Sequence, residues 1–547
     1  MLDPTFARIL LDTLGVSFTS SSPSSPEVDP LAPQQHTSLL SSPSRRIGAI
    51  AGLLSGGLAV TIGMLVAALG GVASPIDAVG SSFIDRTPHW LKTLAIDWFG
   101  TNDKTALRVG IVIVLAAIAL VAGSFSVTSP KPLISAILIF AFLGALSASE
   151  REGSNGASIL APIVGAAIGI ASAVFLLGML TNRWLATSTP SPSRVPLGWD
   201  RRRFVRASAA VGATAVTAGL IGQSKEQQRV RSTESQRPDS LPPVSNSLPP
   251  TEISQDVSFI TPNSDFYRID TALSFPNVNL ETWKLRIRGL VDQEITLSYA
   301  DIAAMPQVEK TITICCVSNE VGGPYIGNAV WQGVYLKDLL MQAGVKPEAQ
   351  QLFSRSLDGW TCGFPIEVAL DGRDALLAIG MNGEPLSLAH GFPARLIVPG
   401  IYGYISATKW LSEIEVNKWS DAEGYWIPRG WSRDAPIKTQ SRIDVPRTGA
   451  TVTAGQIRIA GVAWAQHTGI EKVEVRIDAK EWNEAVLSDD ISDDTWRLWT
   501  FDWQSTSGEH TIQVRATDKS GYTQTEMVTG VAPDGATGWH TRTVSVA

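Results

Sequence analysis

The chain divides into two halves by the way its apolar residues are arranged. The first half contains long runs without a charged side chain, namely Ile47–Ile76, Val109–Pro130, Pro132–Ser149 and Ser154–Asn182. A helix needs roughly 20 residues to cross the hydrocarbon core of a bilayer, and each run reaches or approaches that length. Helices buried in a soluble core are the alternative, but so many such runs in succession favour a membrane. Residues 47–182 are therefore predicted to form a four-span membrane domain.

Charged residues around these runs indicate an orientation. Lys and Arg precede the first run at Arg45-Arg46 and follow the fourth run, whereas the loop before the fourth run carries Glu150-Arg151-Glu152. Because cytoplasmic loops are enriched in Lys and Arg, the N-terminus and residues 183–203 are predicted to lie in the cytoplasm. Residues 1–46 are rich in Ser, Pro and Thr, and we expect a disordered cytoplasmic tail there.

A fifth apolar run follows a cluster of arginines. The segment Asp200-Arg201-Arg202-Arg203-Phe204-Val205-Arg206 precedes the uncharged run Ala207–Ser224. Paired arginines, a nearby aromatic residue and a mildly apolar segment resemble a twin-arginine export signal placed inside the chain. An ordinary fifth span with flanking arginines is the alternative. In both cases residues 183–224 are predicted to be a basic cytoplasmic loop and a span, which leaves the rest of the chain outside the cytoplasm.

The pattern changes again after this run. Residues 225–255 are polar and rich in Pro and Ser, and we expect a semi-extended spacer there. Residues 256–434 alternate between short strands and short helices and are predicted to form an α+β domain. Leu285–Val291 is typical of a half-exposed strand, and Leu336–Ala343 of an amphipathic helix that ends at Gly344.

The last part of the chain, residues 435–547, is predicted to be an all-β sandwich. Short strands recur there at a regular spacing with turn residues between them. The expected strands are Ile457–Trp464, Ile470–Asp478, Trp496–Trp503, His510–Asp518 and Thr541–Val546.

Composition excludes several classes of protein. The net charge of −7 argues against nucleic acid as a partner. Three cysteines are too few for a disulfide framework, so the stability of the fold must come from burial. A zinc site is poorly supported because the chain has no CxxC pair, and Cys362 is the one cysteine outside the adjacent pair Cys315-Cys316.

The adjacent cysteines close a strand-like run. Thr311–Ile314 is β-branched, and small and turn-forming residues follow Cys316, so Cys316 is expected where a strand opens into a loop. Neighbouring side chains alternate between the faces of a strand, so at most one of the two thiols faces a site. Small buried hydrophobic residues are the alternative interpretation for both.

Two blocks carry a resemblance to a known family. Cys316 is followed by Asn319 and Gly322-Gly323, and the second block is His390-Gly391-Phe392-Pro393-Ala394-Arg395, then Pro399-Gly400 and Lys409-Trp410. Together they resemble the molybdenum-cysteine loop and the H-G-x-P-x-R…P-G…K-W block of the sulfite oxidase family of molybdopterin enzymes. The resemblance covers about residues 255–547. It also implies that the C-terminal sandwich is immunoglobulin-like and supports a homodimer, as in several members of the family.

The resemblance implies a molybdopterin cofactor and a set of site residues. Cys316 aligns with the thiolate that binds molybdenum, which a soft ligand suits. The residues implied to hold the pterin and its phosphate are His390, Arg395 and Lys409. Weaker matches add Asn263, Phe266, Tyr267, Arg268 and Asp358 as cofactor-binding residues and Tyr425 as a catalytic residue beside the metal. A core histidine, a solvated lysine and a core tyrosine are the alternatives for His390, Lys409 and Tyr425.

The cysteine loop departs from the family at the positions that select the substrate. Sulfite oxidases carry arginines directly after the Asn, where they bind an oxyanion, but this chain has Glu320 and Val321 there. Each lost charge-assisted contact costs about 1.5–3 kcal/mol, and a carboxylate repels a dianion. We therefore expect a neutral S- or N-oxide rather than sulfite, with a sulfite- or nitrate-type enzyme as the alternative.

An external electron carrier is expected. The sequence has no CxxCH haem motif and no histidine within a predicted span, so we expect a cytochrome, a quinone-linked membrane protein or a soluble carrier to exchange the electrons. The sequence thus predicts a molybdenum-dependent oxidoreductase in the cytoplasmic membrane, with its catalytic domain outside. A non-enzymatic, membrane-anchored binding protein is the alternative.

Overall fold

The computed structural model describes residues 44–88, 91, 98–99, 103–151, 154–181, 201–244 and 257–547. The tail predicted for residues 1–46 lies almost entirely outside the described residues, as do residues 183–200 of the predicted cytoplasmic loop and residues 245–255 of the predicted spacer.

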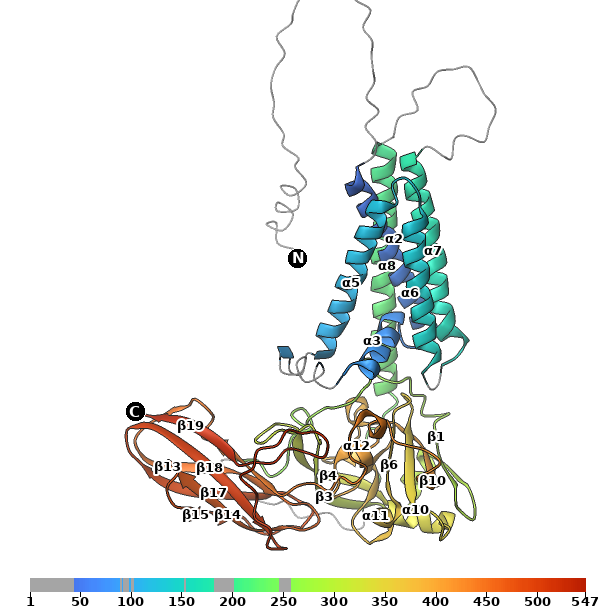
Figure 1. Ribbon diagram of the computed structural model, residues 1–547. Coiled ribbons are helices and arrows are strands. Elements are labelled where there is room, and N and C mark those ends of the chain that lie inside the picture. Colours follow the sequence, from blue (N-terminus) through green and yellow to red (C-terminus); the bar gives the residue numbers. More distant parts are fainter. Residues whose placement is uncertain are drawn as a thin grey trace, which may run out of the picture. The chain divides into compact units, whose positions relative to one another are not determined.

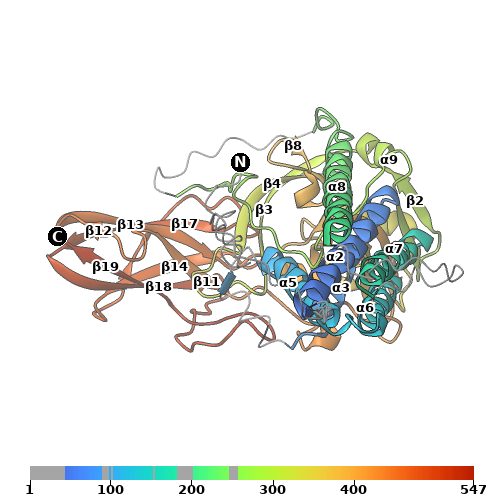
Figure 2. The same cartoon turned by 90° about the horizontal axis from the view of Figure 1, so that it is seen from above.

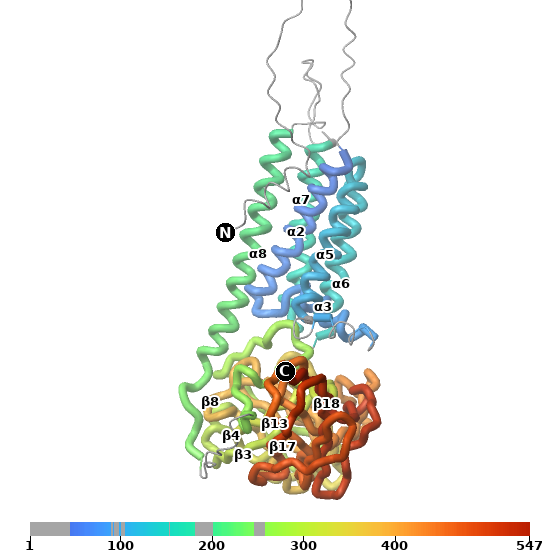
Figure 3. The backbone as a smooth tube through the Cα atoms, turned by 90° about the vertical axis from the view of Figure 1, so that its left-hand side faces the viewer, coloured from blue at the N-terminus to red at the C-terminus, as the bar shows by residue number. Residues whose placement is uncertain are grey.

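The described residues include five helices that are long and apolar enough to cross a membrane (Figure 1). They are α2 (Arg45–Leu69), α5 (Asp103–Phe125), α6 (Lys131–Ser149), α7 (Gly156–Thr181) and α8 (Arg201–Glu234). Each of the five predicted spans corresponds to one of them. Figure 3 shows that α2 and α8 begin at the same end of the bundle.

The first predicted span is longer than the helix that forms. The run to Ile76 breaks after Leu69, where Gly70 caps α2 and Gly71 adopts a φ of 66°. A second helix, α3 (Pro75–Arg86), then begins, because the Ser74 side chain accepts a hydrogen bond from the Asp77 amide and proline suits the first helical turn. The boundary at Ile76 was therefore wrong.

The predicted spacer is also corrected at its start. Helix α8 continues through residues 225–234, which we expected to be semi-extended. These residues contain no proline, and Arg229 pairs with Glu226 one turn earlier. The first proline, Pro238, lies just beyond the helix, where a helix is expected to have ended.

Small residues allow the long helices to approach closely. In Figure 2, α2 lies between α5, α7 and α8, and it packs against all three. A Cβ atom on Gly165 of α7 would lie 2.3 Å from the Ala59 carbonyl oxygen, and one on Gly52 of α2 would lie 2.2 Å from the Ala119 oxygen. Close backbone approach of this kind is how helices gain packing energy in lipid.

Two sheets frame the α+β region. One has the order β2 (Ile295–Ser298), β1 (Lys284–Gly289), β10 (Leu411–Asn417), β5 (Gln351–Ser356) and β6 (Thr361–Pro365). The other has the order β3 (Val308–Cys315), β4 (Ile326–Tyr335), β7 (Leu376–Met381) and β8 (Glu384–Pro385), and β9 (Arg395–Ile397) pairs with β7. The short helices are α9 (Tyr299–Ala304), α10 (Leu336–Ala343), α11 (Ile366–Leu370), α12 (Gly403–Ser406) and the 3-10 helices η3 (Leu388–His390) and η4 (Ile427–Arg429).

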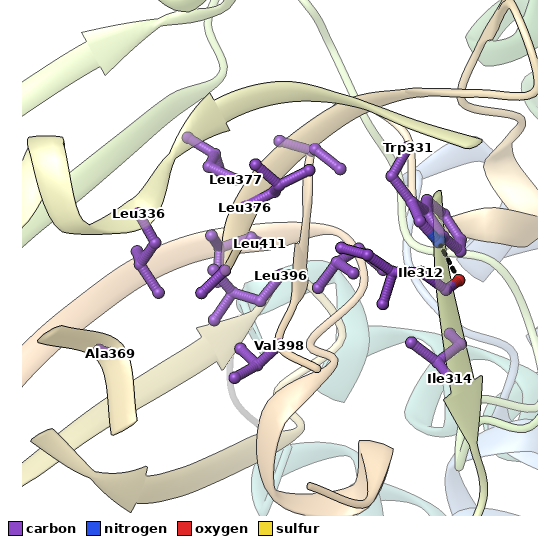
Figure 4. Close-up of a cluster of buried hydrophobic side chains, with 14 of the residues drawn as sticks. Ile312, Ile314, Trp331, Leu336, Ala369, Leu376, Leu377, Leu396, Val398 and Leu411 are labelled. Carbon is purple, nitrogen blue, oxygen red and sulfur yellow. Dashed lines mark hydrogen bonds between the residues drawn. The ribbon is translucent and has the colours of Figure 1, made fainter. Parts of the chain in front are cut away.

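The core of this region is continuous between the two sheets. Figure 4 shows Ile312 and Ile314 of β3 close to Trp331 of β4, whose indole N–H donates a 3.1 Å hydrogen bond to the Ile312 oxygen. The helix predicted over Leu336–Ala343 is α10, and it ends at Gly344 with a φ of 71°, as expected of a C-terminal glycine. The core thus fixes the end of β3, where the cysteines lie.

The C-terminal residues form a two-sheet sandwich. One sheet has the order β11 (Gln440–Val445), β13 (Gly455–Trp464), β17 (Arg497–Ser505) and β16 (Val486–Leu487), and the other β12 (Thr451–Val452), β19 (His540–Val546), β18 (Gly508–Asp518), β14 (Ile470–Ile477) and β15 (Asn483–Glu484). All five predicted strands form. The strands that we did not predict include three of only two residues, too short for an alternating pattern to stand out.

Candidate cofactor site

The cysteine loop begins where β3 ends. The Cys316 amide donates a 2.9 Å hydrogen bond to the Tyr325 oxygen, and the Asn319 side-chain oxygen accepts a 2.7 Å bond from the Tyr325 amide. Both thiols are buried, but Cys315 belongs to the hydrophobic core and Cys316 lies outside it. The two cysteines therefore differ in their surroundings, and the expectation that Cys316 faces a site stays a prediction. Burial raises the pKa of the Cys316 thiol, and hydrogen bonds with Ser318 oppose that rise.

A small cavity lies next to the end of β3, and Cys316 itself is not among its lining residues. Its lining brings together residues from three parts of the sequence: Phe266, Tyr267, Ile269, Ile314, Ala389, His390, Arg395 and Lys409. Ile314 belongs to β3, two residues before Cys316. Burial raises the pKa of Tyr267, the neighbouring thiols of Cys316 and Cys315 add to the rise, and Arg395 opposes it. Tyr267 thus lies within electrostatic reach of both Cys316 and Arg395.

His390 is held as a neutral ring. Its Nε2 atom donates a 2.9 Å hydrogen bond to the Asn263 backbone oxygen, and the Phe266 ring meets it edge-on at 5.9 Å. Burial lowers the pKa of His390 to about 4, and the cations Arg395 and Lys409 act in the same direction. The ring therefore contributes no charge to the cavity near neutral pH.

Arg395 is a buried cation with an unused donor. It lies in β9, its guanidinium carbon is 5.0 Å from the centre of the Trp331 ring, and Nη1 donates a 3.1 Å bond to the His390 oxygen. Within the described residues its Nε atom has no hydrogen-bond partner. Burial lowers the pKa of Arg395 to about 10, so the side chain remains charged. An unpaired buried donor is costly, which favours an anionic ligand at this position.

Gly391 allows the two basic side chains to converge. Its φ is 110°, and a Cβ atom there would lie 3.1 Å from the Lys409 Cβ atom and 3.2 Å from the Arg395 Cβ atom. A larger residue would be strained and would crowd both neighbours. The glycine between the histidine and the arginine of the motif therefore has a steric role.

Lys409 belongs to a charge cluster centred on Asp270. The Asp270 carboxylate accepts bonds from Lys409 at 2.7 Å, from Arg268 at 3.0 Å and from Lys104 of α5 at 2.5 Å, and it is 4% exposed. Burial alone would raise the pKa of Asp270, but the three cations hold it well below its usual range. Burial lowers the pKa of Lys409 to about 8, against the pull of Asp270.

Asp270 and Lys104 were missed by sequence reasoning. Lys104 is 166 residues from its partner and lies in a different predicted region, so no local pattern connects them. The one available signal was Asp270 itself, an acidic residue two places after Arg268 in a segment already expected to contact the cofactor.

The weaker matches separate into two groups. Phe266 and Tyr267 line the cavity. Arg268 pairs with Asp270, which also pairs with the lining residue Lys409, and Asn263 contributes its backbone oxygen to His390. Asp358 instead accepts a 3.0 Å bond from the Trp360 amide within the turn between β5 and β6.

Tyr425 has partners outside the cavity. Its hydroxyl donates a hydrogen bond to Asp85 of α3, and its ring packs against Trp426 and beneath Arg429. The structure therefore joins Tyr425 to the helical region, and a catalytic role beside the metal stays a prediction.

The sandwich also contributes to the cysteine loop. The His540 ring of β19 packs on Gly322, where a Cβ atom would lie 2.2 Å from its Cδ2 atom, and Arg442 of β11 donates a 3.0 Å bond to the Gly323 oxygen. His540 is a neutral acceptor, because its Nδ1 atom receives the Ile443 amide at 2.9 Å. No local motif marked these two residues, which lie more than a hundred positions from the loop.

The two buried histidines predict an acid-sensitive fold. Burial lowers the pKa of His390 and of His540 to about 4, below the usual 6.5. Between these values the unfolded chain binds protons that the folded chain does not, so the free energy of unfolding falls as pH falls through this window. We expect a loss of about 2 kcal/mol per histidine between pH 7.5 and pH 5.

Denaturant unfolding at the two pH values tests this prediction. His540→Gln should lose less stability on acidification than the wild type. His510→Gln is the control, because the Asp478 carboxylate raises the pKa of the partly exposed His510, and this substitution should not lessen the loss. An equal loss in wild type and His540→Gln would contradict the prediction.

Comparison with known proteins identifies the family. Residues 272–426 match the oxidoreductase molybdopterin binding domain, and residues 440–514 match the bacterial Ig domain. The chain is 39% identical over 153 residues to an uncharacterized oxidoreductase, YuiH, of Bacillus subtilis, covering 28% of this chain and 74% of the relative. It is 30% identical over 331 residues to sulfite oxidase of Gallus gallus, covering 52% of this chain and 72% of the relative.

A mammalian relative is covered less completely. The chain is 31% identical over 302 residues to mitochondrial sulfite oxidase of Rattus norvegicus, which is 46% of this chain and 54% of that protein. The chain thus spans about half the length of this relative. From the matched domains and the relatives together, the chain belongs to the sulfite oxidase family of molybdenum-dependent, molybdopterin-binding oxidoreductases.

Proposed function

We propose that this protein is anchored in the cytoplasmic membrane by its five long helices and catalyses oxygen-atom transfer outside the cytoplasm, at a molybdenum bound by Cys316. One observation carries the proposal. Ile314, two residues before Cys316, lines a cavity together with His390, Arg395 and Lys409, three residues that the sequence places in a separate block.

The charges of the residues around the cavity suit the phosphate of the cofactor. Lys409, Arg268 and Lys104 share one carboxylate, Asp270, and Arg395 adds a further cation to the cavity lining, so the cluster has an excess of positive charge for a phosphate. The described residues contain no group of three or more His, Cys, Asp or Glu that could hold a metal ion, which suits a centre whose other ligands come from a pterin. When bound, the cofactor supplies the redox chemistry, and the protein supplies one thiolate and the cations.

The cavity must open to admit the cofactor. It has a volume of about 20 Å³, room for one water molecule. The lining side chains, with Phe266 and Tyr267 among them, therefore have to move apart when a pterin binds. Both belong to the segment between Asn263 and Asp270, which has no helix or strand of its own.

Exposed apolar side chains support anchoring in a membrane. Ile113 of α5 is 62% exposed and Phe142 of α6 is 67% exposed. Large apolar groups on the outside of a bundle are unfavourable in water and favourable in lipid. Arg45 and Arg201 lie at the helix starts that share one end of the bundle, and the positive-inside rule assigns that end to the cytoplasm. A twin-arginine role for residues 201–206 is part of the proposal.

The substrate we propose is a neutral S- or N-oxide. Glu320 and Val321 occupy the positions where sulfite oxidases carry arginines, and Glu320 is exposed. One observation favours sulfite as a second candidate. Arg442 lies against the cysteine loop and could supply a positive charge from the sandwich, although it also pairs with Asp444 at 2.6 Å.

The proposed electron partner is an external cytochrome or a quinone-linked membrane protein, and a homodimer through the sandwich is also proposed. Molybdenum and pterin content of the purified full chain test the cofactor, with about one of each per chain expected. Turnover of sulfoxides, N-oxides and nitrate with a reduced viologen dye, and of sulfite with an electron acceptor, then tests the substrate. Absence of both molybdenum and pterin would overturn the function, and sulfite oxidation at rates typical of the family would overturn the neutral substrate.

A further inference from the structure

Side chains from α5 and α8 hold one wall of the cavity in place. We define the wall segment as residues 266–275, which contributes Phe266, Tyr267 and Ile269 to the lining. Lys104 of α5 donates to the Asp270 carboxylate at 2.5 Å and to the Ala272 oxygen at 3.0 Å.

The remainder of the wall segment is held in the same way. Arg108, one turn after Lys104, donates to the Leu273 oxygen and pairs with Asp77 of α3 at 2.8 Å. Arg229 of α8 donates to the Phe275 oxygen at 3.1 Å. Contacts to the backbone oxygens of Ala272, Leu273 and Phe275 therefore hold the end of the wall segment from the helical region.

A second part of the lining, Ala389 and His390, is held by the end of α8. Glu234 accepts a 2.8 Å bond from the Leu388 amide, at the start of the 3-10 helix η3 that carries His390. Arg237 donates to the Pro385 oxygen and pairs with Glu234 at 3.2 Å. Two separate parts of the cavity lining are thus joined to the helices.

Lys104 has a further electrostatic consequence. Asp270 is almost fully buried and shares its charge with Lys409, which lines the cavity, and with Arg268. An anionic phosphate that attracted those two cations would leave a buried carboxylate without compensation, which is strongly unfavourable. Lys104 approaches the other carboxylate oxygen and can stay there, so it keeps Asp270 paired while Lys409 and Arg268 engage the anion.

We propose that the helical region is a latch on the cofactor site, with Lys104 as its positioning residue: it pairs Asp270 and fixes the wall segment, so that the cofactor is retained. The latch rests on the proposed function, because the group that it retains is molybdopterin. It assigns to the helices a role in the catalytic centre, beyond attachment to a bilayer.

Cofactor retention by the full chain tests the latch. Lys104→Met should lose pterin and molybdenum about tenfold faster than the wild type on prolonged washing. This is the size of effect seen when a residue that supports a ligand-binding residue is replaced. Lys104→Arg keeps the charge and should restore most of the retention. Arg86→Met is the matched control, because Arg86 pairs with Glu150 in the helical region at 2.8 Å and both side chains are exposed.

Hydrogen exchange of the wall segment provides a second measurement that needs no cofactor. Residues 266–275 should exchange faster in Lys104→Met than in wild type or Arg86→Met, while the sandwich strands remain unchanged. Unchanged exchange in the sandwich strands also shows that the variant has folded. If Lys104→Met does not fold, Lys104→Gln is measured in its place. Wild-type retention and wild-type exchange in the Lys104 variants would overturn the latch. A wild-type chain without pterin would instead overturn the proposed function, and hydrogen exchange would still decide whether the helices hold the wall.

Discussion

Cys316→Ser is expected to abolish molybdenum binding while the pterin remains on the protein. A serine hydroxyl has nearly the size of the thiol but is a hard and far less acidic donor, so it does not replace a soft thiolate in the coordination sphere. The contacts of Arg395 and Lys409 do not involve Cys316 and stay intact. We expect activity to fall more than about 100-fold, beyond the 10–100-fold typical of groups that only support a ligand.

Metal analysis and pterin fluorescence on the same sample measure this effect. Cys362→Ser is the matched control, because the Cys362 thiol already contacts the hydroxyls of Ser354 at 3.3 Å and Thr408 at 3.1 Å, and a serine suits that setting. The control should keep both molybdenum and pterin. Full molybdenum content in Cys316→Ser would remove this thiol from the metal site.

Arg395→Met is expected to produce the complementary result, a protein that fails to keep the pterin itself. A charge-assisted hydrogen bond contributes about 1.5–3 kcal/mol, so the cofactor should bind about 10- to 100-fold more weakly. The free energy of unfolding of the cofactor-free protein should not fall by a comparable amount. Its Arg395 is buried with an unpaired Nε atom, and a methionine fills similar space without that cost.

The comparison of binding and stability separates a functional arginine from a structural one. Pterin content and denaturant unfolding of the cofactor-free chain would be measured for Arg395→Met, Arg395→Lys and Arg355→Met. Arg355 pairs with Glu413 at 3.1 Å on a partly exposed surface, so its loss should leave pterin content unchanged. Arg395→Lys keeps the charge without the planar fork and should give an intermediate result. A large loss of stability with normal pterin content would make Arg395 a structural residue.

Local patterns predicted the elements of this protein well. The uncharged runs are helices, because a long apolar segment has few other stable conformations. The alternating segments are strands, and Gly344 ends α10 because its left-handed φ is open to glycine. The prediction failed where two local signals competed. A Gly-Gly pair ended α2 within an apolar run, and helix-forming residues after Ser224 extended α8 into a segment that its prolines had marked as a spacer.

The candidate site shows the same division. Cys316, His390, Arg395 and Lys409 were found because they lie in two compact motifs whose residue types match a thiolate ligand and a phosphate-binding cluster. Asp270, Lys104, Arg442 and His540 were missed because each acts on a residue far away in the sequence. Tyr425 was assigned from its motif, but its hydroxyl bonds to Asp85 of a distant helix.

The sequence by itself determined the apolar helices, the strand that ends at the cysteines, the family and the basic residues of the cofactor block. These follow from periodicity and from motifs that a few adjacent residues carry. Only the tertiary structure decided which cation neutralises Asp270, which helices brace the cavity and which sandwich residues meet the cysteine loop. The physical reason is that a buried charge is compensated by whichever partner the packing of distant elements brings within about 3 Å, and local sequence carries no record of that packing.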